Sequence, residues 1–110
     1  MKKFLVIGNP IEHSLSPKLQ NYWMKKNNIN GLYNKKKLND NELENLVSDI
    51  RNKNLIGVNV TVPFKRKIIS YIDELEPSAE KTQSVNTIYL KSNKVVGQNT
   101  DIDGFERALK

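Results

Sequence analysis

The sequence predicts an α/β domain with a mainly parallel, mixed sheet that is flanked by helices and ends in a hairpin. First, short apolar runs with strand periodicity alternate with longer segments that have one apolar helical face. Second, turn signals rich in Gly, Pro and Asn separate these segments. Third, the strand-like segments 85–90 and 94–98 are joined by a Lys-Ser-Asn-Lys turn, which is typical of a hairpin.

The first half of the chain predicts two strand–helix units. Ser16 before Pro17 has the pattern of an N-cap with proline in the first helical position. We expect Trp23 to anchor this first helix on the core. Asn39 and Glu42 have the spacing of a capping box before the second helix. The expected elements are a strand over 3–8, a helix over 16–26, a strand over 32–38 and a helix over 39–50.

The segment NVTVPFK, residues 59–65, lies at the centre of the predicted arrangement. Its valines alternate with Asn59 and Thr61, so the two polar side chains point to one side of the sheet. Pro63 stops the strand and begins a helix, which places Lys65 in the first turn of that helix. The expected elements of the second half are a strand over 55–62, helices over 63–72 and 77–82, the hairpin, and a last helix that Asp103 caps.

Composition excludes several classes of protein and site. The chain has no cysteine, which rules out disulfides, thiolate metal sites and a cysteine nucleophile, and fits a reducing compartment. The apolar run near the start is broken by Gly8 and Pro10, too early for a secretory signal, and no stretch has membrane-spanning length. We therefore expect a soluble, cytoplasmic protein. The last predicted helix has barely begun at Lys110, so we expect the chain to be the front part of something longer.

The formal net charge of +6 raises the question of nucleic-acid binding. The excess is lysine rather than arginine, and it is spread along the chain. The one dense run, residues 35–37, has only Tyr33 as a nearby aromatic. We interpret the lysines as a solvated surface and expect neither a nucleic-acid nor a membrane partner. The same positive field would serve an anionic small-molecule ligand equally well.

Polar residues gather where predicted strands end, which is the usual site geometry of open α/β sheets. Each cluster also has a purely structural alternative. Ser16 and Asp101 can be helix caps, Asn86 can be a turn residue, and Asn59 with Thr61 can be the solvent face of an edge strand. The clusters are Ser14 and Ser16; Asn59, Thr61 and Lys65; Asn86 and Thr87; and Asn99, Thr100 and Asp101.

Taken together, these clusters resemble the four motifs of the shikimate dehydrogenase family in order and spacing. The matching segments are GNPIEHSLSP at 8–17, NVTVPFK at 59–65, VNT at 85–87 and GQNTDIDG at 97–104. The whole chain, 1–110, is similar to the amino-terminal substrate-binding half of that enzyme. The resemblance implies an α/β domain that binds shikimate, followed by a Rossmann domain that binds NADP and is absent from this chain.

The resemblance also implies roles for individual residues. Ser14 and Ser16 would hydrogen-bond the substrate carboxylate, as suits hydroxyls near a helix N-terminus. Lys65 and Asp101 would be the catalytic pair, because a protonated lysine stabilises charge on a ketone oxygen and can deliver the proton. His13, the only histidine, is expected to be structural, with a general-acid role as the alternative. The residues implied to bind ring hydroxyls are Asn59, Thr61, Asn86 and Asp101.

The implied activity is NADPH-dependent reduction of 3-dehydroshikimate to shikimate in aromatic amino-acid biosynthesis. The five glycines form no G-x-G-x-x-G fingerprint, so we expect no cofactor-binding residue in this chain and no activity from it alone. We also expect no metal site. Two alternatives stay open: a quinate/shikimate dehydrogenase that uses NAD, and a non-catalytic module that binds shikimate-like acids. The sequence leaves the oligomeric state open.

Overall fold

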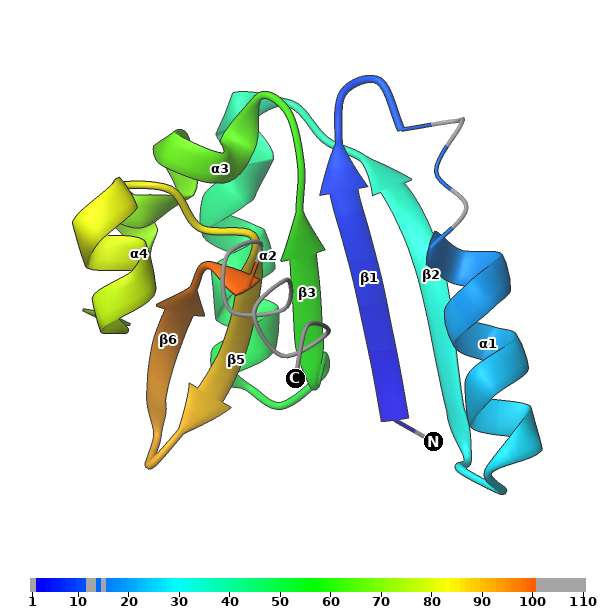
Figure 1. Ribbon diagram of the computed structural model, residues 1–110. Helices are drawn as coiled ribbons and strands as arrows, with labels where there is room; N and C mark the ends of the chain where they lie inside the picture. The colour runs from blue at the N-terminus through cyan, green and yellow to red at the C-terminus, as the bar shows by residue number, and fades with distance from the viewer. Residues whose placement is uncertain (1, 12–13, 15, 101–110) are drawn as a thin grey trace.

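A computed structural model describes residues 2–11, 14 and 16–100 of the chain. The described residues form one six-stranded sheet with the strand order β2-β1-β3-β5-β6-β4 (Figure 1). β1 pairs in parallel with β2 and β3, and β4 with β6, whereas β5 is antiparallel to both β3 and β6. The prediction of a mainly parallel mixed sheet with a hairpin is confirmed. The strands are β1 (Lys2–Gly8), β2 (Gly31–Lys37), β3 (Gly57–Val60), β4 (Glu74–Leu75), β5 (Thr87–Lys91) and β6 (Lys94–Gln98).

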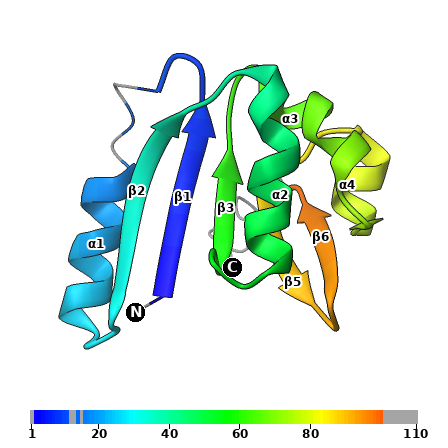
Figure 2. The ribbon, with the colours of Figure 1, turned by 180° about the vertical axis from the view of Figure 1, so that it is seen from behind.

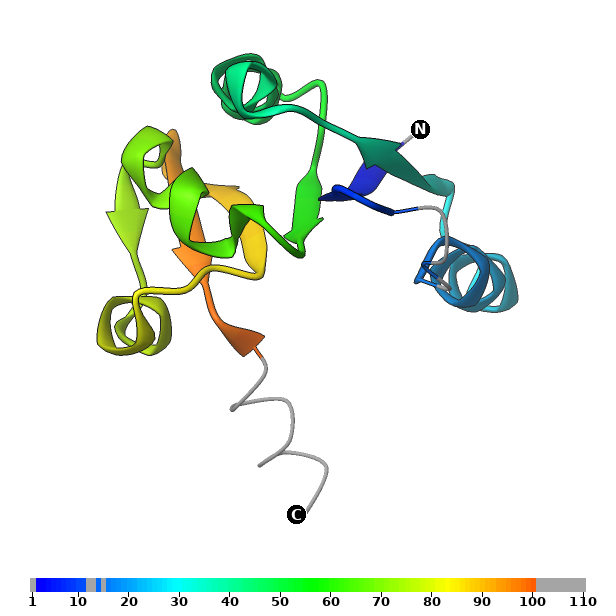
Figure 3. The same ribbon diagram turned by 90° about the horizontal axis from the view of Figure 1, so that it is seen from above.

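Helices lie on both faces of this sheet. The helix α1 runs alongside β2 in Figure 1, whereas α2 lies behind the sheet next to β3 and comes to the front in Figure 2. Seen from above, the two helices lie on opposite sides of the strands (Figure 3). The helical elements are α1 (Ser16–Lys26), η1 (Asp40–Glu42), α2 (Leu43–Arg51), α3 (Phe64–Lys67), η2 (Ile68–Tyr71) and α4 (Pro77–Thr82), where η marks a 3₁₀ helix.

The second half of the strand β1 is buried on both faces because helical elements cover each face of the sheet there. Ile7 belongs to the main core, which α2, α3 and η2 cover, whereas Val6 belongs to a second, smaller core beneath α1. Consecutive residues of a strand point to opposite faces, so an unbroken apolar run is what such a position requires. The second core also contains Ile11, Met24 and Tyr33.

The predicted start of the second helix is confirmed in the structure. The backbone N–H of Asn39 donates to Oε1 of Glu42 at 2.9 Å, which is the reciprocal half of a capping box. The chain passes through η1 before α2 begins at Leu43. The four predicted apolar positions of α2 are all buried: Leu43, Leu46, Val47 and Ile50.

The expectation that Trp23 anchors α1 on the core is wrong, since its side chain is 54% exposed. Met24, the next residue, is buried instead. The reason is the way α1 is attached to β2. The side-chain amide of Asn21 donates to the carbonyl of Tyr33 at 2.7 Å and accepts from its N–H at 2.8 Å. With Asn21 facing the edge strand, Met24 turns inward and Trp23 turns outward. A Cβ at Gly31 would come within 2.6 Å of the Met24 sulfur, so glycine makes room for it.

The strand predicted over 55–62 is shorter at both ends in the structure, where β3 spans only Gly57–Val60. Val62, expected to continue the apolar alternation, is 65% exposed. The N–H of Phe64 donates to the carbonyl of Thr61 at 3.0 Å, which closes a turn around Val62. The helix that follows is also divided into α3 and the 3₁₀ helix η2, and the predicted helix after residue 102 lies outside the described residues.

Phe64 fixes the start of α3 because its side chain is almost completely buried in the main core. Phe64→Ala is expected to lower the free energy of unfolding by about 3–5 kcal/mol, the usual cost of emptying a buried aromatic site. Val62→Ala, two residues away at an exposed side chain, should change it by less than about 0.5 kcal/mol. Urea denaturation of both variants checks this, and equal losses would show that Phe64 is not an anchor.

Asp73 makes part of the stability depend on pH. Its carboxylate accepts from the N–H of Val95 at 2.8 Å and pairs with Arg51 at 3.1 Å. The Val95 hydrogen bond, and then Arg51, hold the pKa of Asp73 below its ordinary value despite some desolvation. The stabilisation is therefore present above the ordinary aspartate pKa, near 4, and is lost as pH falls through the lowered folded-state pKa.

We expect Asp73→Asn to remove this pH-dependent stabilisation. The free energy of unfolding of the variant should therefore fall less between pH 5 and 2 than that of the unchanged chain. Urea midpoints measured across this range check the prediction. Parallel pH profiles for the two proteins would contradict it.

Candidate functional site

The carboxyl ends of β1 and β3 lie side by side, at the top of the view in Figure 1, and the loops that follow them are joined. The N–H of Thr61 donates to the carbonyl of Ile7 at 2.9 Å, and the N–H of Asn9 donates to the carbonyl of Val62 at 2.9 Å. These bonds hold the loop after β1 against the turn after β3. This edge of the sheet is therefore the candidate ligand site.

Thr61 lies over the end of β1 because Gly8 has no side chain. A Cβ at Gly8 would come within 2.5 Å of the Thr61 methyl carbon and 3.2 Å of the Val62 carbonyl oxygen. Any larger residue would push Thr61 away from this position. The half-buried Thr61 is thus held beside the first loop, which contains Ser14.

Asn59 points to the face of the sheet that α1 covers, opposite its neighbours Val58 and Val60, which belong to the main core. Its side-chain oxygen accepts a hydrogen bond of 2.6 Å from the Tyr33 hydroxyl. Its side-chain nitrogen donates to the carbonyl of Asn86 at 3.4 Å and to the hydroxyl of Thr87 at 3.3 Å. Asn59 therefore connects the edge strand β2 with the antiparallel strand β5.

The side chain of Asn86 is buried, and its oxygen is surrounded by donors. Oδ1 accepts from the Thr100 N–H at 2.9 Å, from the Thr100 hydroxyl at 3.0 Å and from the Thr87 hydroxyl at 3.0 Å. An amide whose oxygen is held in this way has a fixed orientation. The amide nitrogen of Asn86 is consequently the end that faces away from Thr100.

Thr100 reaches Asn86 because the end of β6 is anchored to α4. The buried Asn99 donates from its backbone N–H to the Ser78 hydroxyl at 3.1 Å and from its side chain to the Thr82 hydroxyl at 3.1 Å. The N–H of Asn86 donates in turn to the carbonyl of Gln98 at 3.0 Å. The VNT and QNT segments, predicted as separate clusters, are thus one hydrogen-bonded unit.

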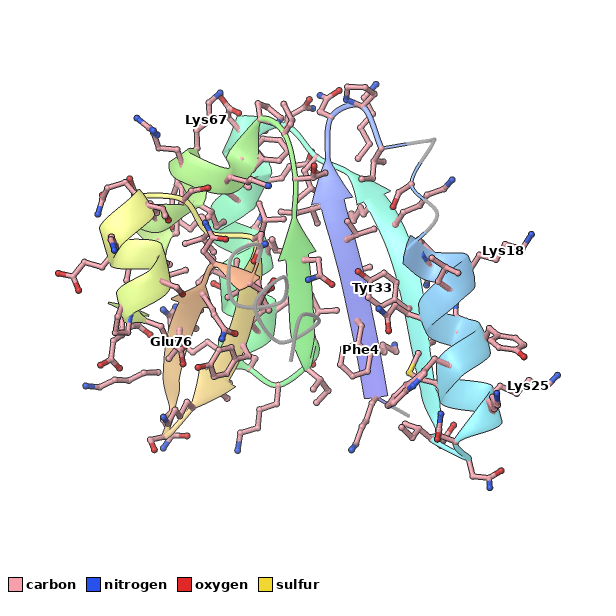
Figure 4. All side chains as sticks on the ribbon, in the orientation of Figure 1. Phe4, Lys18, Lys25, Tyr33, Lys67 and Glu76 are labelled. Atoms are coloured by element: carbon pink, nitrogen blue, oxygen red, sulfur yellow. The ribbon has the colours of Figure 1, made fainter. Side chains whose placement is uncertain are left out.

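Lys65 lies in the first turn of α3 and is half-buried. Its carbonyl accepts from the N–H of Val85 at 2.7 Å, which ties this turn to the segment just before Asn86. Lys67, on the same short helix, points outward and forms a 3.0 Å ion pair with Asp40 at the surface (Figure 4). The two lysines thus have different surroundings although they are only two residues apart.

The structure brings together many but not all of the predicted site residues. Asn59 and Asn86 share one hydrogen-bonded network, and Thr61 lies at the adjacent strand end. Ser14 follows β1, where its N–H donates to the carbonyl of Ile11 at 3.1 Å. The side chain of Ser16, and all of His13 and Asp101, lie outside the described residues, so their predicted roles stay predictions.

Sequence reasoning missed Tyr33 as a member of the network. It was noted only as an aromatic residue beside a lysine run, yet its hydroxyl contacts Asn59 directly. The available signal was its position as the one aromatic residue of a strand that is rich in lysine, since a buried tyrosine usually finds a partner for its hydroxyl.

Other features of the described residues lie apart from this network. A hollow of about 410 Å³ at the edge of the hairpin is lined by Glu74, Glu76, Lys91 and Lys94 among others. Nearby, the hydroxyl of Tyr89 donates to Glu76, which raises the pKa of Tyr89 to about 12. Across residues 2–11, 14 and 16–100, no three His, Cys, Asp or Glu side chains are grouped to hold a metal ion. No helix in this part of the chain is long and apolar enough to cross a membrane.

The chemistry of the network suits a small molecule with several hydroxyl groups. The described groups are neutral amides and hydroxyls, which both donate and accept, and Lys65 lies in the turn that is tied to the segment before Asn86. Such a set fits a polyol better than an apolar ligand, and the lysine favours a substrate on which negative charge is present or develops.

Comparisons with known proteins agree with this chemistry. The family model described as the shikimate dehydrogenase substrate binding domain matches residues 6–88. The chain is 57% identical over 109 residues to a shikimate dehydrogenase (NADP(+)) from Pelagibacter ubique, covering 99% of this chain and 41% of that protein. It is 44% identical over 110 residues to the protein of the same name from Bacillus subtilis, covering 99% and 39%. The chain thus spans about 40% of the length of these curated relatives.

Solved structures show the same similarity in three dimensions. Shikimate 5-dehydrogenase from Listeria monocytogenes, in complex with shikimate and NAD, superposes with a TM-score of 0.91 at 37% identity, over 99% of this chain and 38% of that one. The Thermus thermophilus enzyme, in complex with NADP(H) and shikimate, gives 0.89 at 31% identity, over 99% and 41%. The fold, the strand-end motifs and the family model agree, and the chain belongs to the shikimate dehydrogenase substrate binding domain family.

Proposed function

We propose that this chain binds shikimate and 3-dehydroshikimate and forms the substrate-binding half of an NADP-dependent shikimate dehydrogenase. The enzyme would reduce 3-dehydroshikimate to shikimate in the cytoplasm, as a step of aromatic amino-acid biosynthesis. The observation that carries the proposal is the network in which Asn59 and Asn86 are held, with fixed amide orientations, at the ends of β3 and β5. Similarity to a structure in complex with shikimate supports it.

Binding would use groups from four segments of the chain. The amides of Asn59 and Asn86, the hydroxyl of Thr61 and the carboxylate of Asp101 would bind the ring hydroxyls. Ser14 and Ser16 would hydrogen-bond the carboxylate, which also faces the N-terminal end of α1, where unpaired N–H groups favour an anion. The net charge of +6 attracts such a substrate at long range.

Lys65 would act on the carbonyl oxygen that is reduced. The chemistry that a bound NADPH would supply is hydride transfer to the carbonyl carbon. The protonated Lys65 amine would stabilise the negative charge that develops on the oxygen and would transfer a proton to complete the hydroxyl. Asp101 would hold the ammonium group in place and favour its charged form. The fixed start of α3, with Phe64 buried and Lys65 tied to Val85, provides the rigid base for this role.

The cofactor would be bound outside this chain. The five glycines of this chain form no dinucleotide fingerprint, and the relatives named for NADP(+) are more than twice as long as the chain. NAD is the second candidate, because the Listeria structure is a complex with shikimate and NAD. Steady-state rates with each nucleotide, using the complete gene product, separate the two.

The binding proposal predicts that the purified chain binds shikimate and that Asn59→Ala weakens this binding about threefold to tenfold, the usual effect of losing one neutral hydrogen bond. Asn45→Ala, at an exposed asparagine on α2, is the matched control and should leave the affinity unchanged. Calorimetric or NMR titration measures all three proteins. If the titration shows no binding of shikimate to the unchanged chain, the proposal is refuted.

The catalytic role predicts a different effect for Lys65. When this chain is joined to the dinucleotide-binding part of the Bacillus subtilis relative, Lys65→Ala should lower kcat at least about a hundredfold while KM for shikimate changes only a few fold. Lys67→Ala removes a lysine from the same helix and should leave kcat close to normal, because Lys67 pairs with Asp40 at the surface. If Lys65→Ala instead raises KM and leaves kcat intact, Lys65 is a binding residue and His13 becomes the next candidate acid.

A further inference from the structure

We propose that Tyr33 is a positioning residue for the substrate site, which fixes the side-chain amide of Asn59 so that its NH₂ group is presented as a donor to a substrate hydroxyl. The proposal rests on the function proposed above. Tyr33 itself is 5% exposed and lies in the core beneath α1, and its hydroxyl contacts the Asn59 amide, through which we assign its role.

Tyr33 is itself held in place from two directions. Its backbone N–H and carbonyl are both bound by the side-chain amide of Asn21, at 2.8 and 2.7 Å, which joins α1 to the edge strand. Its ring stacks on Phe4 of the neighbouring strand, with centroids 6.4 Å apart and planes 17° from parallel (Figure 4). The phenol is thus a rigid group whose hydroxyl has one defined position.

The direction of the Asn59 amide follows from what its neighbours can donate or accept. The carbonyl of Asn86 only accepts, and it already receives the N–H of Val60 at 2.8 Å. The Asn59 atom facing it must therefore be the nitrogen, because an oxygen there would repel the carbonyl. The amide oxygen then faces Tyr33, and the phenol must donate to it across 2.6 Å.

This arrangement leaves the amide nitrogen as the adaptable end. Its contacts with Asn86 and Thr87 are 3.4 and 3.3 Å long, well beyond the usual 2.9–3.0 Å, whereas the Tyr33 contact is short. A ligand hydroxyl that approaches more closely would be a better acceptor for one of the two hydrogens. By holding the amide oxygen, Tyr33 makes Asn59 a hydrogen-bond donor toward the ligand. A substrate group that lies against Asn59 must therefore be able to accept a hydrogen bond.

The test uses Tyr33→Phe, which keeps the stacked ring and removes only the hydroxyl. In ¹⁵N-resolved NMR of the free chain, we expect the Asn59 NH₂ signals to move toward those of exposed asparagines. In a shikimate titration, we expect the affinity to fall about threefold to tenfold. In an Asn59→Ala background, Tyr33→Phe should have no further effect, because the two residues act as one unit.

The matched control is Tyr89→Phe. It also removes a hydrogen-bonded tyrosine hydroxyl, but one that donates to Glu76 by the hairpin. It should leave both the Asn59 signals and the affinity unchanged. Unaltered Asn59 signals in Tyr33→Phe, or losses that multiply in the double variant, would overturn the inference. If the unchanged chain does not bind shikimate, the proposed function fails and Tyr33 has no substrate role, while the Asn59 signals still decide whether it orients the amide.

Discussion

The parallel pairing of β1 with β3 is the constraint on which the rest of the structure depends. It places two strand ends side by side, and the hydrogen bonds beyond them, from Thr61 to Ile7 and from Asn9 to Val62, continue the pairing into the loops. The first loop leads to α1, and the second leads within a few residues to Lys65. A single strand pair therefore sets the positions of groups that are about 50 residues apart in the sequence.

Groups that can only accept or only donate give the polar network its direction. A backbone carbonyl can only accept a hydrogen bond, and a backbone N–H can only donate one. The Asn86 carbonyl therefore fixes the orientation of the Asn59 amide, and the Thr100 N–H fixes that of the Asn86 amide. Among the described residues, no buried side-chain nitrogen or oxygen lacks a partner. A fully satisfied network of this kind is rigid, so the donors it presents to a ligand are already oriented before binding.

The sequence was sufficient for the fold class, the strand-end motifs and the order of the elements apart from the two-residue strand β4, which was not predicted, because each depends on local periodicity and turn chemistry. It failed where tertiary contacts decided the outcome. Apolar spacing favoured Trp23 as the core residue of α1, but the Asn21–Tyr33 contact turns Met24 inward instead. Val62 continued the alternation, but the turn closed by Phe64 takes it out of the sheet. Tyr33 joined the network through a partner 26 residues away, a pairing that no local pattern encodes.

Charge and hydrogen bonding have separate tasks in this domain. The lysines that give the chain its positive charge lie mostly on the surface, as Lys18 and Lys25 on α1 and Lys67 on α3 illustrate (Figure 4). At such positions they attract an anion but cannot distinguish one hydroxylated acid from another. Discrimination requires short-range contacts with defined donors and acceptors, and in the proposed function the neutral amides and hydroxyls at the ends of β3 and β5 would supply them. Neutral groups also cost less to bury than charges do, which explains how Asn86 and Asn99 occupy the interior beside the site.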